Sequence, residues 1–411
     1  MIDDLFLLSR QMVRIHHRTY RRYFIQNTDL SVPCAIILGA RGVGKTTTLV
    51  QVLVDRFPEY TSSRECLYLP IDHAAVGSRT LYEIAKEFAE QGGKLLCIDE
   101  IHKDPDWSRD LKSIRDSFPG LQLVISGSSM LHIRRGSHDL ARRALVYHIE
   151  GLSFREFLEM RFNLTLSAIS LPDILSNHES ISAGIVSCLE EKEAAVLALF
   201  RQYLETGYYP YFLAFDDPVQ MRMMVEQSAR TALEGDLPAV HPKISGSTIA
   251  RVAKLLAILA ETTPMTPNLA RLARLVDVTD SRTMKNYLAY LEDAGLIMGL
   301  TRGGGGLRNF EKPEKIYLGD PNLVHALSQW RGVDMGFLRK TFFCRMLIGR
   351  HKICAATKAD FTVDDRLSFE IGGRNKGASQ IADARNGYLA LDEMPVGIAH
   401  RIPLWLFGFC Y

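Results

Sequence analysis

The sequence predicts an α/β fold in which a parallel β-sheet carries helices on both faces. Between residues 34 and 150, short β-type runs alternate with helical runs, which is the pattern of parallel strands joined by crossover helices. The β-type runs are apolar almost throughout, as strands buried on both faces should be. They read CAIILG, CLYLPID, LLCIDE, LQLVISGS and ALVYHIE. Between them, helices are expected to begin at Lys45, Thr80 and Trp107.

The first predicted strand runs into a glycine-rich loop at residues 39–46, GARGVGKT, which fits the pattern G-x-x-x-x-G-K-[ST] without departure. Glycines in such a loop let successive N–H groups face phosphates, and the helix that follows adds its positive N-terminal end. The sequence therefore predicts a P-loop NTPase sheet that binds ATP, with GTP as the open alternative. The expected nucleotide contacts are Gly39, Ala40, Arg41, Gly42, Val43, Gly44, Lys45, Thr46 and Thr47.

Side chains at this edge of the sheet predict hydrolysis with Mg²⁺. Lys45 is expected to reach the β and γ phosphates, and the Thr46 hydroxyl to be a magnesium ligand. A second apolar strand, residues 95–98, ends in Asp99 and Glu100, which puts two carboxylates beside the loop. Asp99 should hold Mg²⁺ through its water shell, and Glu100 should orient or deprotonate the attacking water. The sequence thus predicts an ATPase.

Two serines and two arginines are further candidates for catalysis. Ser126 and Ser128 end the fourth strand, close to where the γ-phosphate would lie, so one hydroxyl is expected to sense the phosphate or position the water. A helix cap by Ser128 is the alternative. Arg142 and Arg143 precede the last strand, where an arginine would stabilise developing charge in its own subunit or, in a homo-oligomer, in a neighbouring one. For either arginine, the alternative is a solvated loop charge.

Downstream of the predicted ATPase core, residues 1–165, the period of the apolar residues becomes helical. Residues 166–245 are expected to form a helical lid or linker. Residues 246–325 show helix, helix, turn, helix and a glycine-tipped hairpin, which predicts a winged helix-turn-helix. Residues 326–411 mix helical segments with the short strands DFTV, LSFEI, GYLALD and PLWLFGF, which predicts a small C-terminal α/β domain.

The predicted winged helix carries polar side chains where a DNA-reading helix meets the major groove. On that helix they are Ser281, Arg282, Lys285 and Asn286, and on the wing they are Arg302, Arg308, Lys312 and Lys315. The opposite stripe of the helix, expected to be buried, is Met284, Tyr287, Leu288 and Leu291. Winged helices also dock proteins, so double-stranded DNA and a protein partner are both kept as alternatives.

The overall composition narrows the class of protein without identifying a partner. Lys plus Arg number 49 against 47 Asp plus Glu, so the net charge of +2 gives no global reason to bind nucleic acid or a membrane. A local basic cluster at residues 14–22 is interpreted as part of a helix packed on the core, and contact with a nucleic-acid backbone is the alternative. The seven cysteines lack the C-x-x-C spacing of zinc sites, and no apolar run is long enough to span a membrane. A cytoplasmic protein with reduced thiols and no membrane partner is predicted.

Several motifs taken together resemble a known family. They are GARGVGKTT, LLCIDEIHK, VISGSSM, LARRALVYHIEGLSFREFLE and the tail segments FEIGGRNK and IPLWLFGF. Over nearly the whole chain, this combination is similar to a bacterial and archaeal family of AAA-type P-loop ATPases with a C-terminal domain of unknown function. The resemblance implies a sheet of the additional-strand ATPase type, a winged helix, and a C-terminal fold related to restriction-endonuclease-like nucleases.

The implied nuclease relationship requires an Asp on one strand and Glu-x-Lys on the next, to hold a metal and activate water. Asp360 and Glu370 stand on the two runs as required, while Gly372 occupies the place of the lysine. The substitutes further along the chain are Arg374 and Lys376, with Gln380 on an expected following helix. Loss of positive charge at Gly372 favours a domain without nuclease activity.

These predictions together support magnesium-dependent hydrolysis of ATP that moves a DNA- or protein-binding module relative to the core. One alternative is an ATP-regulated, metal-dependent DNA nuclease that uses Asp360 and Glu370. The other is a signalling scaffold that binds nucleotide without turnover, and the presence of Glu100 argues against it. Release of phosphate from ATP, with and without DNA, discriminates between these classes.

Overall fold

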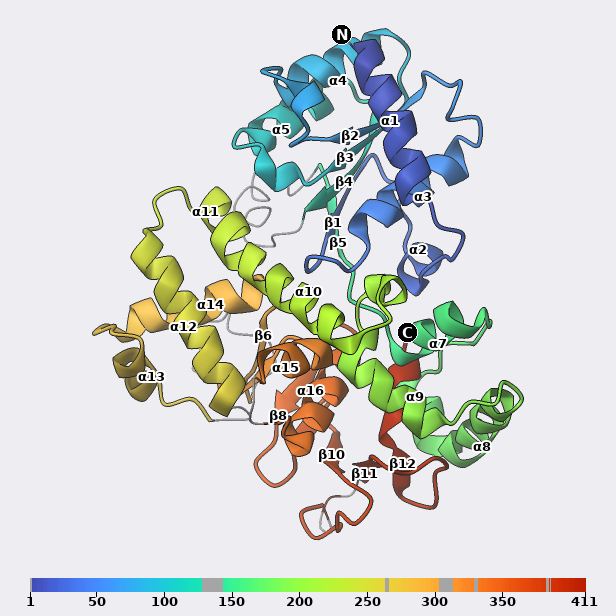
Figure 1. Cartoon of the computed structure of the whole chain (residues 1–411), viewed down its shortest axis with the longest axis vertical. Helices are drawn as coiled ribbons and strands as arrows, with labels where there is room; N and C mark the ends of the chain where they lie inside the picture. Colours follow the sequence, from blue (N-terminus) through green and yellow to red (C-terminus); the bar gives the residue numbers. More distant parts are fainter. Residues whose placement is uncertain are drawn as a thin grey trace. The chain divides into compact units, whose positions relative to one another are not determined.

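The structure is a computed structural model that describes residues 2–127, 143–262, 266–302, 313–328, 332–381, 384 and 386–411. The chain divides into two compact units (Figure 1). Unit 1 comprises Met1–Gly151 and Thr231–Ile244, and unit 2 comprises Leu152–Arg230 and Ser245–Tyr411. Unit 1 is therefore discontinuous in sequence, because it includes a segment that the sequence alone assigns to the helical lid. The four-part division of the chain stays a prediction.

Unit 1 is built on a five-stranded sheet in which every described pairing is parallel. Its strands are β1 (Cys34–Leu38), β2 (Cys66–Pro70), β3 (Leu95–Asp99), β4 (Gln122–Gly127) and β5 (Leu145–His148), in the spatial order β2-β3-β4-β1-β5. The predicted parallel sheet is confirmed. β4 lies between β1 and β3, as the additional-strand type of ATPase sheet requires, so the loops after β1 and β3 leave the same edge one strand apart.

Helices cover both faces of this sheet (Figure 1). They are α1 (Ile2–His16), α2 (Tyr23–Asn27), α3 (Lys45–Arg56), α4 (Leu81–Glu90) and α5 (Trp107–Ser117), with single turns η1 (Ala74–Val76) and η2 (Ile101–Lys103). Leu96 and Ile98 of β3 point to the face covered by α1, α4 and α5, where they join one buried cluster. Cys97 points to the other face, with its sulfur 3.8 Å from the carbonyl oxygen of Leu49 in α3. The alternation that places successive strand residues on opposite faces thus buries both faces.

The second stretch of unit 1 is short and helical. It contains η5 (Ala232–Asp236), a single π-helical turn, and α11 (Leu237–Val240). Leu233, Leu237 and Val240 are buried, as is the carboxylate of Asp236. Helices that belong to unit 2 come before and after this stretch in the sequence.

Unit 2 begins with helices that pack around an aromatic core. They are α7 (Phe154–Phe162), α8 (Leu171–Glu190), α9 (Val196–Gln202) and α10 (Pro218–Thr231), with the turns η3 (Tyr203–Gly207) and η4 (Pro210–Ala214). The ring of Phe154 lies 5.3 Å from that of Phe200 and 5.5 Å from that of Tyr203, between centroids. Ser153, the N-cap of α7, donates to the backbone oxygen of Tyr411 at 2.7 Å. The motif GLSFREFLE therefore serves packing, and it fastens distant parts of unit 2 together.

Three helices and a two-stranded antiparallel hairpin follow. They are α12 (Gly246–Thr262), α13 (Leu269–Leu275), α14 (Ser281–Asp293), β6 (Ile297–Leu300) and β7 (Lys315–Leu318). The predicted buried stripe of α14 is confirmed, since Met284, Tyr287, Leu288 and Leu291 are its buried residues. Arg282 is exposed on the opposite side. The predicted wing residues Arg308 and Lys312 lie outside the described residues.

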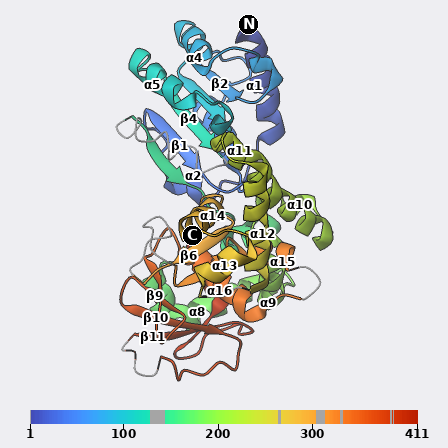
Figure 2. The same ribbon diagram turned by 90° about the vertical axis from the view of Figure 1, so that its left-hand side faces the viewer.

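The C-terminal part of unit 2 holds a second five-stranded sheet (Figure 2). Its elements are α15 (Pro321–Leu327), α16 (Met335–Leu347), β8 (Ile353–Ala355), β9 (Phe361–Val363), β10 (Leu367–Gly372), β11 (Gly387–Leu391), β12 (Arg401–Pro403) and η8 (Leu404–Phe409). The order is β12-β11-β10-β9-β8, antiparallel from β8 to β10 and parallel from β10 to β12. Phe343 of α16 packs on Phe369 of β10, with ring centroids 5.0 Å apart.

Two local predictions in this region are wrong. In the run PLWLFGF, Pro403 ends β12, but Leu404–Phe409 form the 3₁₀-helix η8 and not a strand, with side chains buried against helices α7, α8 and α16. A short apolar run carries no periodicity that separates a strand from a buried helical turn. Gln380 lies in a turn, and the described residues between β10 and β11 form no helix. Of the helices that the structure describes, none combines the length and the apolarity that a bilayer crossing requires.

Candidate functional site

The glycine-rich loop after β1 has a backbone that only its glycines adopt without strain. Gly42 and Gly44 have φ angles of 84° and 101°, in the left-handed region. A Cβ atom added at Gly39 would lie 2.4 Å from the carbonyl oxygen of Ile149. The first glycine therefore lets the chain after β5 approach closely, while the other two turn the loop into α3.

Lys45 begins α3 and its ammonium group folds back into the loop. Its Nζ donates to the carbonyl oxygen of Gly39 at 3.1 Å and to that of Ala40 at 2.8 Å. Burial lowers the pKa of Lys45, and the nearby carboxylates of Glu100 and Asp99 act in the opposite direction. The loop thus carries one buried cation, held by backbone oxygens at the carboxyl edge of the sheet.

Asp99, at the end of β3, is held by three hydroxyl groups. The Thr46 hydroxyl donates to Oδ2 at 2.7 Å, and the Tyr68 hydroxyl donates to the same oxygen at 2.5 Å. The Ser126 hydroxyl donates to Oδ1. Burial, together with the Asp99 charge, raises the pKa of Tyr68 well above its usual range, so this phenol stays a donor. The structure thereby joins the two predicted magnesium ligands, Thr46 and Asp99, directly.

Glu100 follows in a left-handed backbone conformation, with φ of 56° and ψ of 41°. Its N–H donates to the Ser126 hydroxyl at 3.1 Å. Ser126 is fully buried, and its hydroxyl binds both members of the carboxylate pair. In this arrangement Ser126 orients Asp99 and the Glu100 backbone, which is a different task from contacting a phosphate itself. A non-glycine residue with positive φ is uncommon and typical of functional turns.

A third acid, absent from the sequence-based candidates, reaches this edge from the 231–244 segment. One carboxylate oxygen of Asp236 lies 3.0 Å from Lys103 Nζ and 3.5 Å from a guanidinium nitrogen of Arg41. The same oxygen lies 3.5 Å from His102 Nε2, which is also 3.5 Å from a Glu100 carboxylate oxygen. Lys103 and Asp236 are 133 residues apart, so no local motif points to this contact.

Arg22 is a further residue that sequence reasoning missed. For the basic cluster that contains it, the sequence favours packing on the core, with contact to nucleic acid as the alternative, yet this guanidinium is buried against the loop. It donates to the carbonyl oxygens of Val43 at 2.8 Å, Glu150 at 2.7 Å and Gly151 at 2.6 Å. Arg22 therefore fastens the glycine-rich loop to the chain that leaves β5, a role set by backbone oxygens that carry no sequence signal.

The remaining candidates are placed as follows. Arg143 forms a two-pronged ion pair with Asp116 at 2.9 and 3.2 Å. Asp116 lies in the last turn of α5, before β4 begins, so within the described residues this arginine is engaged at the opposite end of the strands from the loop. Ser128 and Arg142 lie outside the described residues. Their roles stay predictions.

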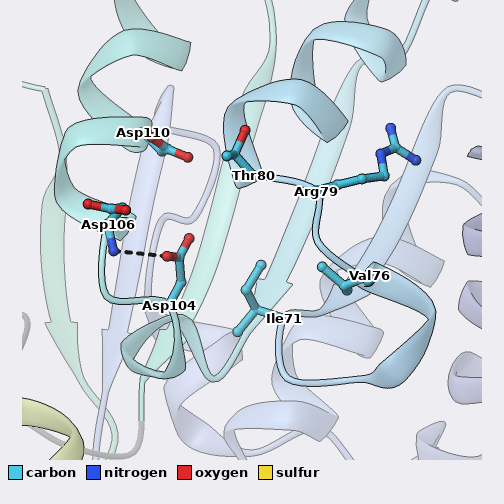
Figure 3. A pocket seen from close by; sticks show the side chains of 8 residues that line it. Ile71, Val76, Arg79, Thr80, Asp104, Asp106 and Asp110 are labelled. Atoms are coloured by element: carbon cyan, nitrogen blue, oxygen red, sulfur yellow. Dashed lines mark hydrogen bonds between the residues drawn. The ribbon is translucent and has the colours of Figure 1, made fainter.

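A cavity of about 210 Å³ lies between the segments that follow β2 and β3 (Figure 3). Its walls include Asp104, Asp106 and Asp110, and the Asp104 carboxylate accepts from the N–H of Asp106 at 2.9 Å. Burial raises the pKa of Asp104. None of its lining residues belongs to the glycine-rich loop. Because its carboxylates repel phosphate, this cavity is a poor match for a nucleotide.

Comparison with known proteins agrees with the geometry of unit 1. Residues 31–158 match the family described as AAA domain. These residues form a P-loop ATPase-like AAA domain. Residues 197–334 match a family described only as a domain of unknown function, DUF8612. The AAA match contains the loop, Asp99, Glu100 and Ser126, whereas Asp236 lies outside it.

Relatives and solved structures are distant. Uncharacterized protein MJ1637 of Methanocaldococcus jannaschii is 29% identical over 193 residues, which are 44% of this chain and 39% of that protein, so the chain spans well under two thirds of its relative. The Walker-type ATPase PABY2304 of Pyrococcus abyssi is 13% identical with a TM-score of 0.43, over 77% of this chain and 94% of that one. Replication initiator DnaA bound to AMPPCP and single-stranded DNA is 14% identical with a TM-score of 0.30, over 70% and 88%.

A second carboxylate pair lies outside the AAA domain, in the C-terminal sheet. Asp360 comes directly before β9 and Glu370 lies in β10, and both are buried. Each has a lysine partner: Lys340 Nζ lies 2.6 Å from Asp360, and Lys376 Nζ lies 2.6 Å from Glu370. A Cβ atom at Gly372 would come within 2.6 Å of the Lys376 side chain. Gly372, which stands where restriction-endonuclease-like nucleases have a lysine, thus leaves the space that the Lys376 side chain occupies.

Proposed function

We propose that the AAA domain binds ATP and hydrolyses its γ-phosphate with Mg²⁺, and that this cycle controls a DNA- or protein-binding module in unit 2. The observation that carries the proposal is the 2.7 Å hydrogen bond between the Thr46 hydroxyl and the Asp99 carboxylate. It places the expected hydroxyl and carboxylate ligands of Mg²⁺ side by side, next to the buried Lys45. Hard oxygen donors of this kind are what Mg²⁺ takes from proteins.

The residues at this site have different roles in nucleotide binding. Lys45 supplies a positive charge to the β and γ phosphates, in place of its bonds to the loop carbonyls. Thr46 and Asp99 would hold Mg²⁺, with Ser126 and Tyr68 fixing the orientation of the Asp99 carboxylate. A bound Mg²⁺ supplies neutralisation of phosphate charge. Because Ser126 and Tyr68 already orient Asp99, this carboxylate needs little reorganisation when the phosphates arrive, whereas Lys45 must exchange its bonds to the loop carbonyls.

Glu100 is assigned to the water. It follows Asp99 at the strand end, and its backbone is held in a left-handed turn by the hydrogen bond to Ser126. That turn separates its side chain from the one of Asp99, so that one carboxylate serves the metal and the other accepts the proton of the attacking water. The neighbouring imidazole of His102 lies 3.5 Å from the Glu100 carboxylate and restrains it.

The output is assigned to helices α12 to α14 and the β6–β7 hairpin, as a winged helix that binds double-stranded DNA or a protein. Its support is the order of these elements, the buried stripe of α14, and the exposed Arg282 on the other side of that helix. The near-neutral net charge of +2 means that the proposed affinity for DNA is local to this face and not global.

The deciding experiment measures phosphate release from ATP and from GTP by the full chain with Mg²⁺, alone and with single- or double-stranded DNA. Turnover that depends on Mg²⁺ and changes with double-stranded DNA is expected. Binding of ATP without any turnover would overturn hydrolysis and favour a nucleotide-gated scaffold. Turnover that ignores both DNA forms would direct the search to a protein partner.

A second candidate function is metal-dependent cleavage of DNA by Asp360 and Glu370. The observation that favours it is the contact between Lys376 and Glu370, because a lysine beside the carboxylates is what such chemistry needs to stabilise developing charge. The side-chain amide of Gln380 faces the same carboxylate. Within the described residues no group of three or more His, Cys, Asp and Glu side chains forms a metal cluster, so a cation there would also draw on backbone oxygens and water.

This candidate is tested on supercoiled plasmid DNA with Mg²⁺ or Mn²⁺. Nicking that requires the metal and disappears in Glu370→Gln would establish a nuclease. DNA that stays intact under every metal condition would assign the C-terminal sheet to binding alone.

A further inference from the structure

Asp236 is the acid that brings together both sides of the nucleotide site in unit 1. Its carboxylate contacts Arg41, which belongs to the glycine-rich loop, and it contacts Lys103 and His102, which follow the Asp99 and Glu100 pair. It is 3% exposed, against 41% for the Arg41 side chain. Charge-assisted contacts of a buried carboxylate are much less screened than those of surface pairs.

The residues around Asp236 favour the charged form of its carboxyl group. Burial alone would raise the pKa of this carboxyl, yet hydrogen bonds from His102 and Lys103 hold it well below its usual range. The group is therefore an anion next to a loop that, by the proposed function, receives a triphosphate. Two anions compete for the same cations, so the Asp236 carboxylate and the phosphates oppose one another through Arg41 and Lys103.

The second arm of the network reaches Glu100. His102 Nε2 lies 3.5 Å from Asp236 and 3.5 Å from Glu100, so one imidazole edge faces both carboxylates. His102 is 1% exposed and has little freedom to turn away. Asp236 thereby fixes the ring that flanks the side chain assigned to the attacking water.

The place of Asp236 in the chain gives this network a direction. The 231–244 segment is joined at both of its ends to chain that belongs to unit 2. When Asp236 gains or loses a contact, the 231–244 segment is held more or less firmly. The chain leaves unit 2 and returns to it through this segment. Coupling between two sites is reciprocal. If a bound nucleotide weakens the contacts of Asp236, those contacts weaken the binding of the nucleotide by the same factor.

We propose that Asp236 is a positioning residue that restrains nucleotide binding through Arg41 and Lys103, supports turnover through His102 and Glu100, and reports the nucleotide state to the 231–244 segment. This inference rests on the proposed ATPase function. It assigns one residue two effects of opposite sign on affinity and on rate. A residue that served folding alone would weaken both.

The test compares wild type with Asp236→Asn, which removes the charge and keeps the shape. ATP affinity is measured by calorimetry and turnover by phosphate release. Asp236→Asn should bind ATP about fivefold more tightly, at the low end of typical coupling between sites. Its kcat should fall about tenfold, because His102 no longer holds Glu100. The matched control is Asp110→Asn, a carboxylate of unit 1 that is equally buried at 4% exposure and outside the loop.

Two further variants separate the arms. In an Arg41→Gln background the gain in affinity from Asp236→Asn should shrink toward zero, since the competition runs through that guanidinium. His102→Gln should reproduce the loss of kcat without the gain in affinity, and it also tests the rate arm if Asp236→Asn does not fold. Hydrogen exchange of the amides at residues 231–244 should rise with ATP in a Glu100→Gln protein and stay constant in a Lys45→Ala protein.

The outcomes distinguish this inference from the function on which it rests. A wild-type chain that releases no phosphate removes the proposed function, whatever Asp236 does. A wild-type chain that turns over ATP, with kcat and affinity unchanged in Asp236→Asn, removes the inference alone. Weaker ATP binding together with slower turnover in Asp236→Asn would likewise overturn it, because that result is the one expected of a structural residue.

Discussion

Two carboxylate pairs, Asp99 with Glu100 in unit 1 and Asp360 with Glu370 in unit 2, are held in different ways. Asp99 accepts from the hydroxyls of Thr46, Tyr68 and Ser126, which are neutral donors. In the C-terminal sheet, by contrast, each carboxylate lies 2.6 Å from a lysine ammonium. Asp99 ends β3 and Glu100 follows it, whereas Asp360 precedes β9 and Glu370 lies within β10. Hydroxyl groups hold Asp99, while lysine ammonium groups hold Asp360 and Glu370.

This difference decides how ready each pair is for a divalent cation. Hydroxyl donors orient a carboxylate and leave its negative charge available, so a metal ion meets a prepared ligand. A lysine neutralises the carboxylate, and a metal must compete with that ammonium before it binds. The comparison supports the proposal that the Asp99 pair binds Mg²⁺, because hydroxyl donors already orient Asp99. Each carboxylate of the Asp360 pair already has a lysine partner.

The largest expected effect is that of Lys45→Ala on the first pair. Without the ammonium beside the β and γ phosphates, ATP affinity should fall about a thousandfold, or ~4 kcal/mol. Calorimetry measures it. The matched control is Lys94→Ala, a surface lysine of unit 1 paired with Glu65, which should keep wild-type affinity. Unchanged affinity in Lys45→Ala would remove the loop from the site altogether.

Glu100→Gln should separate binding from chemistry. The amide keeps the shape of the side chain but cannot accept the proton of the attacking water, so turnover should fall about a hundredfold while ATP affinity stays near wild type. Phosphate release under single-turnover conditions checks this, with the exposed Glu90→Gln as control. A decrease smaller than about tenfold, which is ~1.4 kcal/mol of barrier, would mean that another residue accepts the proton of the attacking water.

Lys376→Met tests whether the second pair depends on its lysine. Removing this cation leaves the buried Glu370 charge without its partner, which should lower the free energy of unfolding by about 2 kcal/mol. Chemical denaturation measures this change. Lys352→Met, whose exposed side chain pairs with the exposed Asp365, should leave stability nearly unchanged. Equal stability of both variants would show that Glu370 does not depend on Lys376.

The smallest expected effect concerns the output module. If α14 reads DNA, Arg282→Ala combined with Lys285→Ala should weaken binding and lower the salt slope of log K by about two, because two fewer phosphates are neutralised. Fluorescence anisotropy across salt concentrations provides the slope. Arg271→Ala with Arg274→Ala, two exposed arginines of α13, is the matched control. Identical slopes in all three proteins would favour a protein partner.

The parts that the sequence predicts well are those encoded by neighbouring residues. The glycine-rich loop, the strand ending in Asp99 and Glu100, and the buried stripe of α14 are local patterns with a fixed period or spacing. The additional strand β4 follows from the resemblance and agrees with the observed order. The loop, the strand end and the stripe each required only a window of a few residues, whereas the place of β4 required the resemblance over nearly the whole chain.

The parts that could not be predicted depend on contacts between distant residues. Asp236 meets Lys103 across 133 residues, and Arg22 binds the carbonyl oxygen of Gly151 across 129. Backbone oxygens carry no residue identity, so nothing in the sequence marks the partners of Arg22. The sequence leaves Arg374 and Lys376 as alternatives for the missing lysine, and only the folded chain shows that the Lys376 side chain fills the space beside Gly372.

The discontinuity of unit 1 sets an order of events on the ribosome. The chain of β1 to β5 emerges first, and Thr231–Ile244 follows only after the first helices of unit 2 have been synthesised. At about 5–20 residues per second this interval lasts several seconds, and domains generally fold as their chain appears. During that interval the nascent sheet carries Arg41 and Lys103 without the carboxylate of Asp236. The unfinished chain should therefore retain ATP more tightly than the finished protein, and bound nucleotide would accompany the folding of unit 1 from its start.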